Sequence, residues 1–450
     1  MKIKLTAVLL FILSFFMLNY KLGNGSLEPW DEAWYADVAR SITRGSIIIP
    51  KYNSDYFIDH PPLGFWTEAL SFKVFGESSH SARLPSAIFA SLTVSIIFLL
   101  GTSISNYYTG IMAALILFTS RWFLLRSRGG DLEPLLMLLQ TTSVYLSWNA
   151  KNIKQLAISW LILSFSLLTK TFVSLSLIPI IIYNTYTFSK MHKFSTLNIL
   201  SLSLLLIFIP LLWYSLTIQV LGIETVKQNI IQVAFRGGEM QGLNLNNVQN
   251  ILLLVRSVIH RWYQPLLFAV VLTPILFFNK TNTKKILVYL TCMLLPYIVS
   301  AKTRSWHIIP VIVPMAILIS YFLSELALYF GRYRSYVSKA FLVFVVIVAG
   351  WSLMEYRSEA YSKTDSISDQ ERIGQSIKYL DGPVYLDAFH NQEPSMIYYA
   401  DRKVIVLSDI KSFNQTLIAR PYILISENNM SLTNCNLIVT TGSTFTHHCQ

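Results

Sequence analysis

The sequence predicts a polytopic α-helical membrane protein with about 11 transmembrane helices and a small α/β domain at its C-terminal end. Of its 450 residues, 53% are hydrophobic and only 13% are charged, whereas soluble domains carry about 25% charged residues. Apolar runs of roughly 17–25 residues, the length that crosses a bilayer core, recur up to residue 355. Beyond that point, charges of both signs accompany short strand-like runs. We therefore expect a transmembrane domain at 1–355 and an extracytoplasmic α/β domain at 356–450.

Eleven apolar stretches are the candidate membrane spans. They are 5–21, 82–104, 107–125, 133–150, 155–169, 171–189, 196–219, 262–279, 285–301, 307–329 and 339–355. The stretches 155–169 and 171–189 could also form one very long helix. We divide them at Lys170, because a lysine in the middle of the bilayer would cost on the order of 2.5–3.5 kcal/mol. No small-residue cleavage site follows the first stretch, so we expect it to be an uncleaved span.

The short basic clusters test this topology. With a cytoplasmic N-terminus and 11 spans, every such cluster falls on the cytoplasmic side, as the positive-inside rule expects. The clusters are Lys2 and Lys4; Lys151 and Lys154; Lys190 and Lys193; Lys280, Lys284 and Lys285; Arg332, Arg334 and Lys339. The net charge of +12 is therefore explained by basic residues in the cytoplasmic loops, and it indicates the orientation of the chain in the membrane. Nucleic acid is not an expected partner, because the chain has no basic block or basic amphipathic helix.

The long first outer loop, residues 22–81, predicts two helices that lie along the membrane surface. The run "DEAWYADVARSITRG" places apolar residues on one helical face and ends at Gly45. The run "PPLGFWTEALSFKVFG" begins with Pro, carries several aromatic residues and ends at Gly76. Aromatic side chains of such helices settle at the headgroup level. A roof of interfacial helices over a membrane cavity suits a lipid substrate that enters sideways.

The C-terminal segment predicts alternating strands and helices. The strand-like runs are "GPVYLDA", "KVIVLSD", "PYILISE" and "NLIVTTG", and the helix-like runs are "DQERIGQSIKYL" and "QEPSMIYYA". Cys435 and Cys449 would lie in an oxidising compartment, where they either pair or remain two free thiols. We interpret His447 and His448 as part of a solvated tail.

In this topology, acidic and basic residues from distant segments meet at one membrane face. Asp31, Glu32, Asp59 and His60 belong to the first loop, Asp131 and Glu133 to the turn "RSRGGDLEP", and Lys170 to the end of a span. Lys302, Arg304 and His307 belong to "AKTRSWHIIPVIVP", and Arg236 to "VAFRGGE". A site for a phosphorylated, lipid-bound substrate needs such a mixture, because cations hold the phosphate and a carboxylate serves the reacting hydroxyl.

Several of these stretches resemble the C-fold glycosyltransferases that use polyprenyl-phosphate sugars, in particular the bacterial aminoarabinose transferase and protein O-mannosyltransferase group. The first loop carries the acidic pair Asp31-Glu32 followed by Tyr35, then "YFIDHPPLG", then Arg83-Leu84-Pro85. Weaker similarities are "RSRGGDLEPLLMLL", "LLTKTFVSL", "RSWHIIPVIVPMAIL" and, in the tail, "PSMIYYADRKVIVL". The resemblance covers most of the chain and implies a protein of the bacterial inner membrane.

The resemblance implies transfer of a sugar from a polyprenyl phosphate to an acceptor in a lipid, glycan or protein, with inversion at the anomeric carbon. Asp31 would be the catalytic carboxylate, and Lys170, Arg304 and His307 would hold the departing phosphate. The full candidate set is Asp31, Asp59 and Asp131 for catalysis and Glu32, Tyr35, His60, Lys170, Arg304 and His307 for substrate binding. Trp34 and the pair Asp59-His60 depart from the aminoarabinose enzymes, which leaves the sugar and the acceptor open.

No spacing of possible ligand residues in the sequence indicates a cofactor with certainty. Asp31, His60 and Asp131 could ligate a divalent metal ion, and His60 could instead bind phosphate or shuttle a proton. The three Cys residues show no metal-binding spacing.

Each candidate also has a structural interpretation. Asp31 and Glu32 could simply begin a helix, Asp131 could cap one, and Lys170 could anchor a span by reaching the headgroups. Arg83 is more typical of an interface anchor than of a ligand. Two other functions remain open, a transporter or flippase and a non-catalytic lipid-binding subunit. A transporter usually shows paired repeats with helices broken at mid-membrane, whereas this sequence has no repeat and its charges lie at one membrane face.

Overall fold

The computed structural model describes residues 1–192, 196–235, 253, 256, 261–299, 307–361, 367–387, 393–407, 420–427, 434–442 and 444–450. They form two compact units. We call Met1–Leu22, Ile58–Gly64 and Leu84–Ser362 the helical unit, and Gly23–Phe57, Phe65–Arg83 and Lys363–Gln450 the loop–tail unit. The first outer loop thus groups mostly with the C-terminal tail, and the helical unit extends beyond the expected boundary at residue 355.

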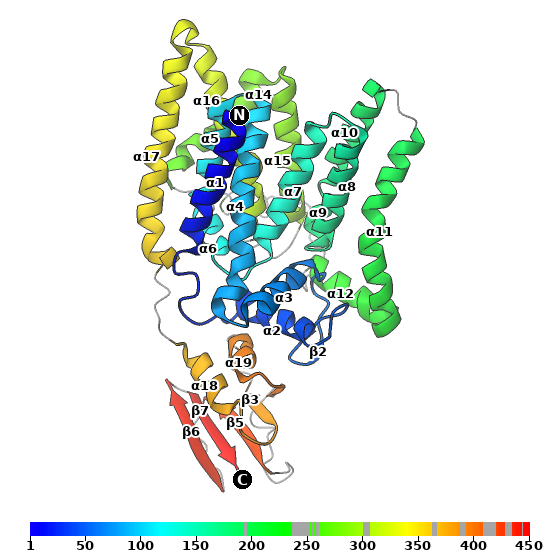
Figure 1. Ribbon diagram of the computed structural model, residues 1–450, viewed down its shortest axis with the longest axis vertical. Coiled ribbons are helices and arrows are strands. Elements are labelled where there is room, and N and C mark those ends of the chain that lie inside the picture. The colour runs from blue at the N-terminus through cyan, green and yellow to red at the C-terminus, as the bar shows by residue number, and fades with distance from the viewer. Residues whose placement is uncertain are drawn as a thin grey trace. The chain divides into compact units, whose positions relative to one another are not determined.

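The helical unit is a bundle (Figure 1). Its helices are α1 (Lys2–Asn19), α4 (Ser79–Ile104), α5 (Tyr107–Phe118), α6 (Arg121–Ser127), α7 (Glu133–Trp148), α8 (Ile153–Leu167), α9 (Thr171–Leu175), α10 (Ile178–His192), α11 (Thr196–Leu221), α12 (Ile223–Phe235), α14 (Phe268–Phe277), α15 (Thr281–Val299), α16 (Ile312–Leu328) and α17 (Arg334–Tyr361). Short 3₁₀ turns η1 (Arg261–Leu267), η2 (Ile309–Val311) and η3 (Gly331–Tyr333) precede α14, α16 and α17.

Five helical segments of the described residues are long and apolar enough to cross a membrane, or six if α5 and α6, which are bent by 69°, form one broken span. The five are Lys2–Asn19, Ser79–Ile104, Thr171–His192, Ile309–Leu328 and Gly331–Tyr361. Others, such as α8, are apolar but shorter. The number of 11 spans therefore stays a prediction, while the mainly helical membrane fold is present.

The division at Lys170 is confirmed. Helix α8 ends at Leu167 and α9 begins at Thr171. Farther from the turn, the indole nitrogen of Trp160 on α8 donates a buried hydrogen bond of 2.8 Å to the hydroxyl of Thr185 on α10. The two segments therefore return alongside each other instead of forming one long helix (Figure 1).

One end of the bundle gathers helix ends that carry basic residues. The ammonium of Lys2 lies 4.5 Å from the centre of the Tyr107 ring, at the start of α5. The side-chain amide of Asn282, on α15, donates to the carbonyl of Ile104, the last residue of α4. The N-terminus, the α4–α5 turn and the start of α15 with its neighbouring lysines thus share one end.

The opposite end is tied together by Arg128. Its guanidinium donates to the carbonyls of Leu18 on α1 (2.5 Å) and Ala360 on α17 (2.9 Å). The hydroxyl of Tyr361 donates to the carbonyl of Met17 (2.9 Å). The last turns of α1 and α17 and the α6–α7 connection therefore lie together at this end, as Figure 1 shows.

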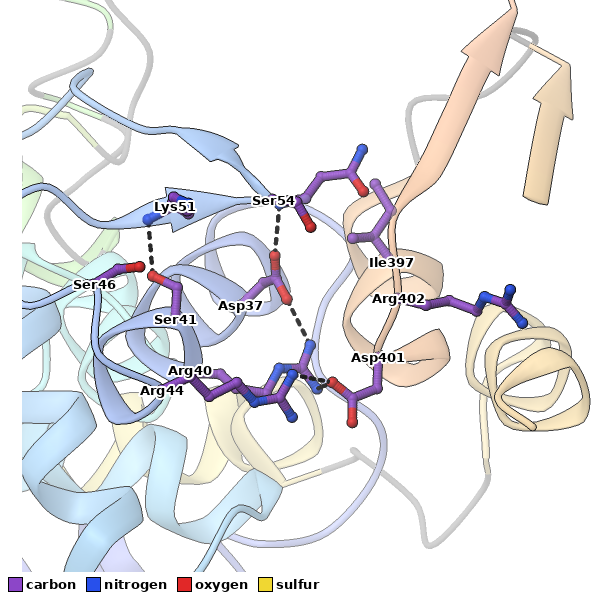
Figure 2. Close-up of a pocket in the computed structure, with 11 residues that line it drawn as sticks. Asp37, Arg40, Ser41, Arg44, Ser46, Lys51, Ser54, Ile397, Asp401 and Arg402 are labelled. Atoms are coloured by element: carbon purple, nitrogen blue, oxygen red, sulfur yellow. Dashed lines mark hydrogen bonds and ion pairs between the residues drawn. The ribbon is translucent and has the colours of Figure 1, made fainter. Parts of the chain in front are cut away.

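Both helices predicted in the first loop are present, as α2 (Asp31–Thr43) and α3 (Leu63–Phe75). Gly45 (φ +110°) and Gly76 (φ +79°) follow them in the left-handed conformation that favours glycine. A hairpin of β1 (Lys51–Tyr52) and β2 (Asp55–Tyr56) was not predicted. It is joined to α2 by a hydrogen bond of 2.8 Å from the Lys51 amide to the Ser41 hydroxyl (Figure 2).

The tail contains a five-stranded sheet of order β4-β3-β5-β7-β6. The strands are β3 (Val384–Asp387), β4 (Val404–Leu407), β5 (Tyr422–Ser426), β6 (Cys435–Thr441) and β7 (Thr444–Cys449). Strand β3 pairs in parallel with β4 and β5, and β7 pairs antiparallel with β5 and β6. Helices α18 (Asp369–Ile377) and α19 (Glu393–Ala400) accompany the sheet. The four predicted strands and both predicted helices are confirmed.

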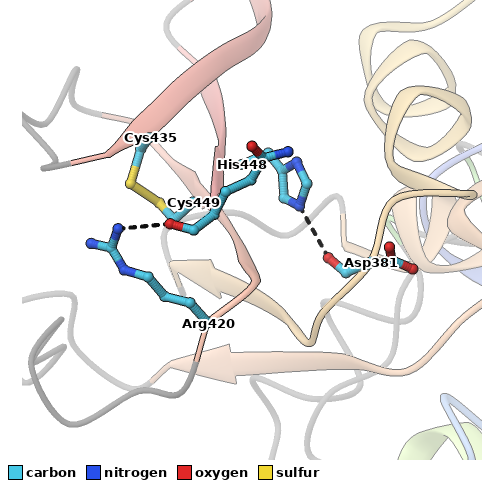
Figure 3. Close-up of a disulfide and its surroundings, with 6 residues drawn as sticks. Asp381, Arg420, Cys435, His448 and Cys449 are labelled. Atoms are coloured by element: carbon cyan, nitrogen blue, oxygen red, sulfur yellow. Dashed lines mark hydrogen bonds between the residues drawn. A yellow bond between two sulfur atoms is a disulfide. The ribbon is translucent and has the colours of Figure 1, made fainter.

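The interpretation of His447 and His448 as a solvated tail was wrong. They belong to β7, between β5 and β6, and are only 5% and 8% exposed. The imidazole of His448 lies 3.2 Å from the carbonyl oxygen of Asp381 (Figure 3). Cys435 and Cys449, directly opposite each other on β6 and β7, form a disulfide. The open question about the two thiols is thereby decided in favour of the pair.

The packing of α4 against α5 depends on Gly110. A Cβ atom at this position would collide with the Phe98 carbonyl oxygen and the Thr102 hydroxyl of α4. We predict that Gly110→Ala lowers the free energy of unfolding by about 1–3 kcal/mol, because the backbones must separate. Gly350→Ala, where a Cβ meets no atom within 4 Å, is the matched control and should be neutral or slightly stabilising. Thermal unfolding in detergent would measure both; equal melting temperatures would contradict the prediction.

Candidate functional site

A group of four charged residues surrounds the start of α7. Arg126 pairs with Asp131 at 2.6 Å, and Lys170 pairs with Glu133 at 2.5 Å. We call these four residues the charge cluster. Both carboxylate side chains are only 4% exposed, whereas Lys170 and Arg126 are 13% and 20% exposed. Because buried charges need partners, the pairing holds the α6–α7 connection and the α8–α9 turn against each other.

Local structure places these side chains. Glu133 is the first residue of α7, where a carboxylate interacts favourably with the helix dipole. Asp131 precedes it in an irregular turn, and the Ser86 hydroxyl of α4 bonds both its backbone carbonyl (2.9 Å) and its backbone amide (3.0 Å). Lys170 has extended backbone angles at the N-cap of α9. The α6–α7 connection and the α8–α9 turn therefore present charge at the same end of the bundle.

The segment Ile58–Gly64, which contains Asp59 and His60, also belongs to the helical unit. The Leu63 amide donates to the Leu168 carbonyl at 3.1 Å, two residues before Lys170. Gly64 has no room for a Cβ, because the side chain of Leu132 occupies that space. The segment is therefore held between the α8–α9 turn and the turn that carries Asp131 and Glu133. The predicted approach of these distant stretches is observed.

Asp59 accepts a hydrogen bond of 2.8 Å from the side-chain amide of Asn229 on α12. Burial raises the pKa of Asp59 above its usual value, and the hydrogen bond from Asn229 offsets part of this shift. His60 is half-buried. A carboxyl group with a raised pKa accepts a proton more readily near neutral pH, which is a property of general bases.

His307 is half-buried and lies two residues before η2, which contacts α7. Arg304 lies outside the described residues, as do Lys302 and Arg236. The structure therefore relates His307 to the α7 side of the bundle and does not test Arg304.

The loop–tail unit contains the other candidates. Glu32 and Arg83 form a buried ion pair, with Arg83 Nε–Glu32 Oε1 at 2.6 Å and Nη2–Oε2 at 2.9 Å. Arg83 also donates to the carbonyls of Asn24 and Ser26, each at 2.8 Å. The interpretation of Arg83 as an interface anchor was therefore wrong, because its guanidinium is buried and holds the segment before α2. Both oxygens of the Glu32 carboxylate accept hydrogen bonds from Arg83.

Tyr35 and Asp31 differ in their surroundings. Tyr35 is 5% exposed and packs on the Phe65 ring with centroids 5.4 Å apart. Asp31 is half-buried at the first position of α2. Of the three candidates on α2, Asp31 is thus the most accessible to a substrate.

Metal ligation is not supported by the arrangement of the described residues. Within them, no three His, Cys, Asp or Glu side chains come together in a way that could hold a metal ion. The proposed set Asp31, His60 and Asp131 therefore does not appear as a ligand group in this part of the chain.

Sequence reasoning missed Arg126. It lies five residues before Asp131, and only the turn at Gly129-Gly130 brings the two side chains together. The available signal was a basic residue just before an acidic turn at a helix start, although the same turn also carries Arg128, which serves other carbonyls. The sequence does not distinguish the two arginines.

Comparisons with known proteins agree with this architecture. A family model described as dolichyl-phosphate-mannose-protein mannosyltransferase matches residues 59–214. An undecaprenyl phosphate-alpha-4-amino-4-deoxy-L-arabinose arabinosyl transferase 2 of Proteus mirabilis is 28% identical over 220 residues, which are 45% of this chain and 39% of that protein. An uncharacterized protein of Aquifex aeolicus is 32% identical over 201 residues, 44% of this chain and 45% of that protein. The chain thus spans less than half the length of these curated relatives.

Solved structures match over nearly the whole chain. The crystal structure of ArnT from Cupriavidus metallidurans bound to undecaprenyl phosphate has a TM-score of 0.76 at 14% identity, covering 98% of this chain and 97% of that one. The archaeal oligosaccharyltransferase AglB from Archaeoglobus fulgidus, in complex with an inhibitory peptide and a dolichol-phosphate, has a TM-score of 0.55 at 12% identity, covering 90% and 65%. The chain is a multi-pass membrane protein with the fold of these structures, that of the C-fold glycosyltransferases. The resemblance predicted from the sequence is confirmed.

The Glu32–Arg83 pair yields a stability prediction. We expect Arg83→Met to lower the free energy of unfolding by about 3–5 kcal/mol, because it leaves the Glu32 carboxylate buried without its guanidinium. Lys403→Gln is the control, since Lys403 and its partner Asp55 are 52% and 73% exposed and such a pair contributes about 0–1 kcal/mol. Chemical denaturation would measure both, and similar losses for the two variants would argue against a structural role for Arg83.

The raised pKa of Asp59 yields a pH prediction. A raised folded-state pKa means that the folded chain binds more protons than the unfolded chain between the two pKa values, so this group lowers stability as pH rises through that window. Asp59→Asn keeps an acceptor for Asn229 and removes the ionisation. We expect its melting temperature, relative to the parent chain, to be higher at pH 7 than at pH 4. A pH-independent difference would show that Asp59 titrates normally.

Proposed function

We propose that this protein is an integral membrane glycosyltransferase that moves a sugar from a polyprenyl-phosphate donor to an acceptor on the extracytoplasmic side, with inversion. The observation that carries the proposal is Lys170, a partly exposed cation at the end of an apolar bundle with the fold of a transferase solved with undecaprenyl phosphate. A transporter or flippase is the weaker alternative, because the described charges of the cluster lie at one end of the bundle.

Lys170 is suited to a phosphate. Its ammonium carries three donors, and among the described residues it bonds only the Glu133 carboxylate. The remaining donors can reach phosphate oxygens with charge-assisted hydrogen bonds. Arg126, which is partly exposed, adds a second positive charge nearby. Positive charge at this position stabilises the phosphate as it departs from the sugar. His60, His307 and Arg304 complete the proposed substrate-binding set.

The proposed reaction is a single displacement. A hydroxyl of the acceptor attacks the anomeric carbon, its proton passes to the Asp31 carboxylate, and the bond from the anomeric carbon to the phosphate oxygen breaks. The products are the glycosylated acceptor and a free polyprenyl phosphate. Asp59, with its raised pKa, is the second candidate for proton transfer. We assign Asp131 and Glu133 to holding Arg126 and Lys170, because both carboxylates are engaged by these cations.

We infer the orientation from charge and from the disulfide. The end of the bundle with Lys2 and the lysines of α15 would face the cytoplasm, following the positive-inside rule. The charge cluster and the tail with the Cys435–Cys449 disulfide would then face an oxidising compartment. In a bacterium this corresponds to the inner membrane with the site on its outer face.

The relatives suggest classes of substrate for this chain. The family description names mannose on dolichyl phosphate, and the named relatives use 4-amino-4-deoxy-arabinose on undecaprenyl phosphate. We propose a polyprenyl-phosphate-linked sugar as the donor and a lipid, glycan or protein as the acceptor. Mass spectrometry of envelope lipids, glycans and proteins with and without the protein would identify both, through a mass difference equal to one sugar.

Asp31→Asn tests the assignment of the base. In purified protein supplied with a panel of undecaprenyl-phosphate-linked sugars, we expect transfer to fall by about 10²–10⁴-fold, the usual contribution of a general base. Asp55→Asn is the control, because Asp55 lies in the same loop, is 73% exposed, and should leave transfer unchanged. Normal transfer by Asp31→Asn would remove Asp31 from the mechanism, and absence of transfer by the parent chain with every donor would remove the function.

A further inference from the structure

A second group of charged residues lies in the loop–tail unit, at the opposite end of α2 from Asp31. It lines an open pocket of about 230 Å³ between α2, the β1–β2 hairpin and the end of α19 (Figure 2). Asp401, directly after α19, contacts three cations: Arg44 at 2.7 Å, Arg40 at 3.4 Å and Lys378 at 3.3 Å. Arg40 and Arg44 belong to the C-terminal end of α2 and the residue after it.

Arg40 is the centre of this group. Its side chain is 5% exposed, and it pairs with Asp37 at 2.6 Å as well as with Asp401. Its guanidinium also lies over the ring of Tyr398 on α19, 4.3 Å from the centroid. The other oxygen of Asp37 accepts from the Asn53 amide at 2.9 Å. The pocket wall is thus a network of ion pairs that joins the tail to the C-terminal end of α2.

The tail also holds the chain just before α2. The Leu27 amide donates to the hydroxyl of Tyr399, the neighbour of Tyr398, at 2.9 Å. The Ser26 hydroxyl donates to the Glu371 carboxylate on α18 at 2.5 Å. Helix α19 contacts α2 directly. The tail therefore holds the chain on both sides of α2, through Tyr399 at Leu27, four residues before the helix, and through Asp401 at Arg40 and Arg44, at its C-terminal end.

Asp401 has an unusual backbone. Its φ angle is +53°, in the left-handed region, which costs most side chains about 1–2 kcal/mol and is visited mainly by Gly, Asn and Asp. A glycine would relieve that strain, but it would remove the carboxylate. Burial by itself would raise the pKa of Asp401, but the hydrogen bond from Arg44 and the nearby positive charges of Arg40 and Lys378 lower it below its usual value. The charged form is therefore the one that this geometry favours.

We propose that the tail domain is a clamp for α2, with Asp401 and Tyr399 as positioning residues for the carboxylate at the start of that helix, Asp31. The proposal rests on the proposed function, since Asp31 matters only if it serves the reaction. Neither Asp401 nor Tyr399 is assigned a contact with substrate. Holding α2 at two points fixes the direction of the helix axis, and displacement of a reacting group by about 1 Å can cost about 10²-fold in rate.

Asp401→Asn is the test, because Asn tolerates the left-handed backbone and removes only the charge. We expect kcat for sugar transfer to fall about 10- to 100-fold with KM for the donor within about twofold. Hydrogen exchange of the α2 amides should become about tenfold faster, with the exchange of β5 and β7 unchanged. Tyr399→Phe, which deletes the acceptor of the Leu27 amide, should change both quantities in the same direction and provides a second measurement if Asp401→Asn does not fold.

Lys403→Gln is the matched control. Lys403 also joins the tail to the loop, through Asp55 at 3.0 Å, but both side chains are more than half exposed, so its loss should change kcat and α2 exchange by less than about twofold. Unchanged exchange in Asp401→Asn and Tyr399→Phe overturns the clamp. Faster exchange with unchanged kcat overturns the positioning role. If the parent chain transfers no sugar, the proposed function fails, while the exchange measurement still decides whether the tail holds α2.

Discussion

The structure depends on the rule that a charge placed against an apolar bundle must have a partner. An uncompensated buried charge costs several kcal/mol, so Lys170 at a break between two apolar helices is tolerated because Glu133 lies beside it. The same rule joins Arg126 to Asp131. The Lys170–Glu133 pair ties together two turns that are 37 residues apart in sequence, and Gly64 lets a third segment fit against Leu132 between them. The candidate site is thus a consequence of how the bundle neutralises its own charges.

Buried charges are also paired in the loop–tail unit, where the two partners of a pair lie farther apart in the sequence. Glu32 on α2 pairs with Arg83 near the start of α4, and Arg40 pairs with Asp401 in the tail. Each buried guanidinium contacts a carboxylate and a second kind of partner. Arg83 also donates to backbone carbonyls, and Arg40 also lies over the Tyr398 ring. An arginine suits these positions better than a lysine because its planar fork serves several partners at once. The first loop therefore acquires a defined structure from contacts that its own sequence does not contain.

What the sequence could predict follows from the range of the forces involved. Apolar runs, alternating apolar residues and turn glycines determine structure within a short stretch of chain. The sequence therefore predicts the break at Lys170, helices α2 and α3, and strands β3 to β6. Other features depend on partners that only the folded chain brings close. They are the ion pair of Arg83, the pairing of Asp131 with Arg126 instead of Arg128, and the bend between α5 and α6. Strand β7 was missed because "TFTHHC" has two adjacent histidines, which read as polar, although both are covered by neighbouring elements of the tail.

The neutrality of the charge cluster has a consequence for the proposed reaction. A polyprenyl-phosphate sugar is a phosphodiester with one negative charge, whereas the released phosphate monoester approaches two near neutral pH, since its second pKa is about 6. Positive charge beside the scissile bond therefore interacts more strongly with the departing phosphate than with the bound donor, which is the condition for lowering a barrier. A free lysine would also retain the product. Because Glu133 takes one of the three donors of the Lys170 ammonium and offsets its charge, the proposed site would hold the spent phosphate less tightly than a free lysine would, and this would favour release of the lipid after transfer.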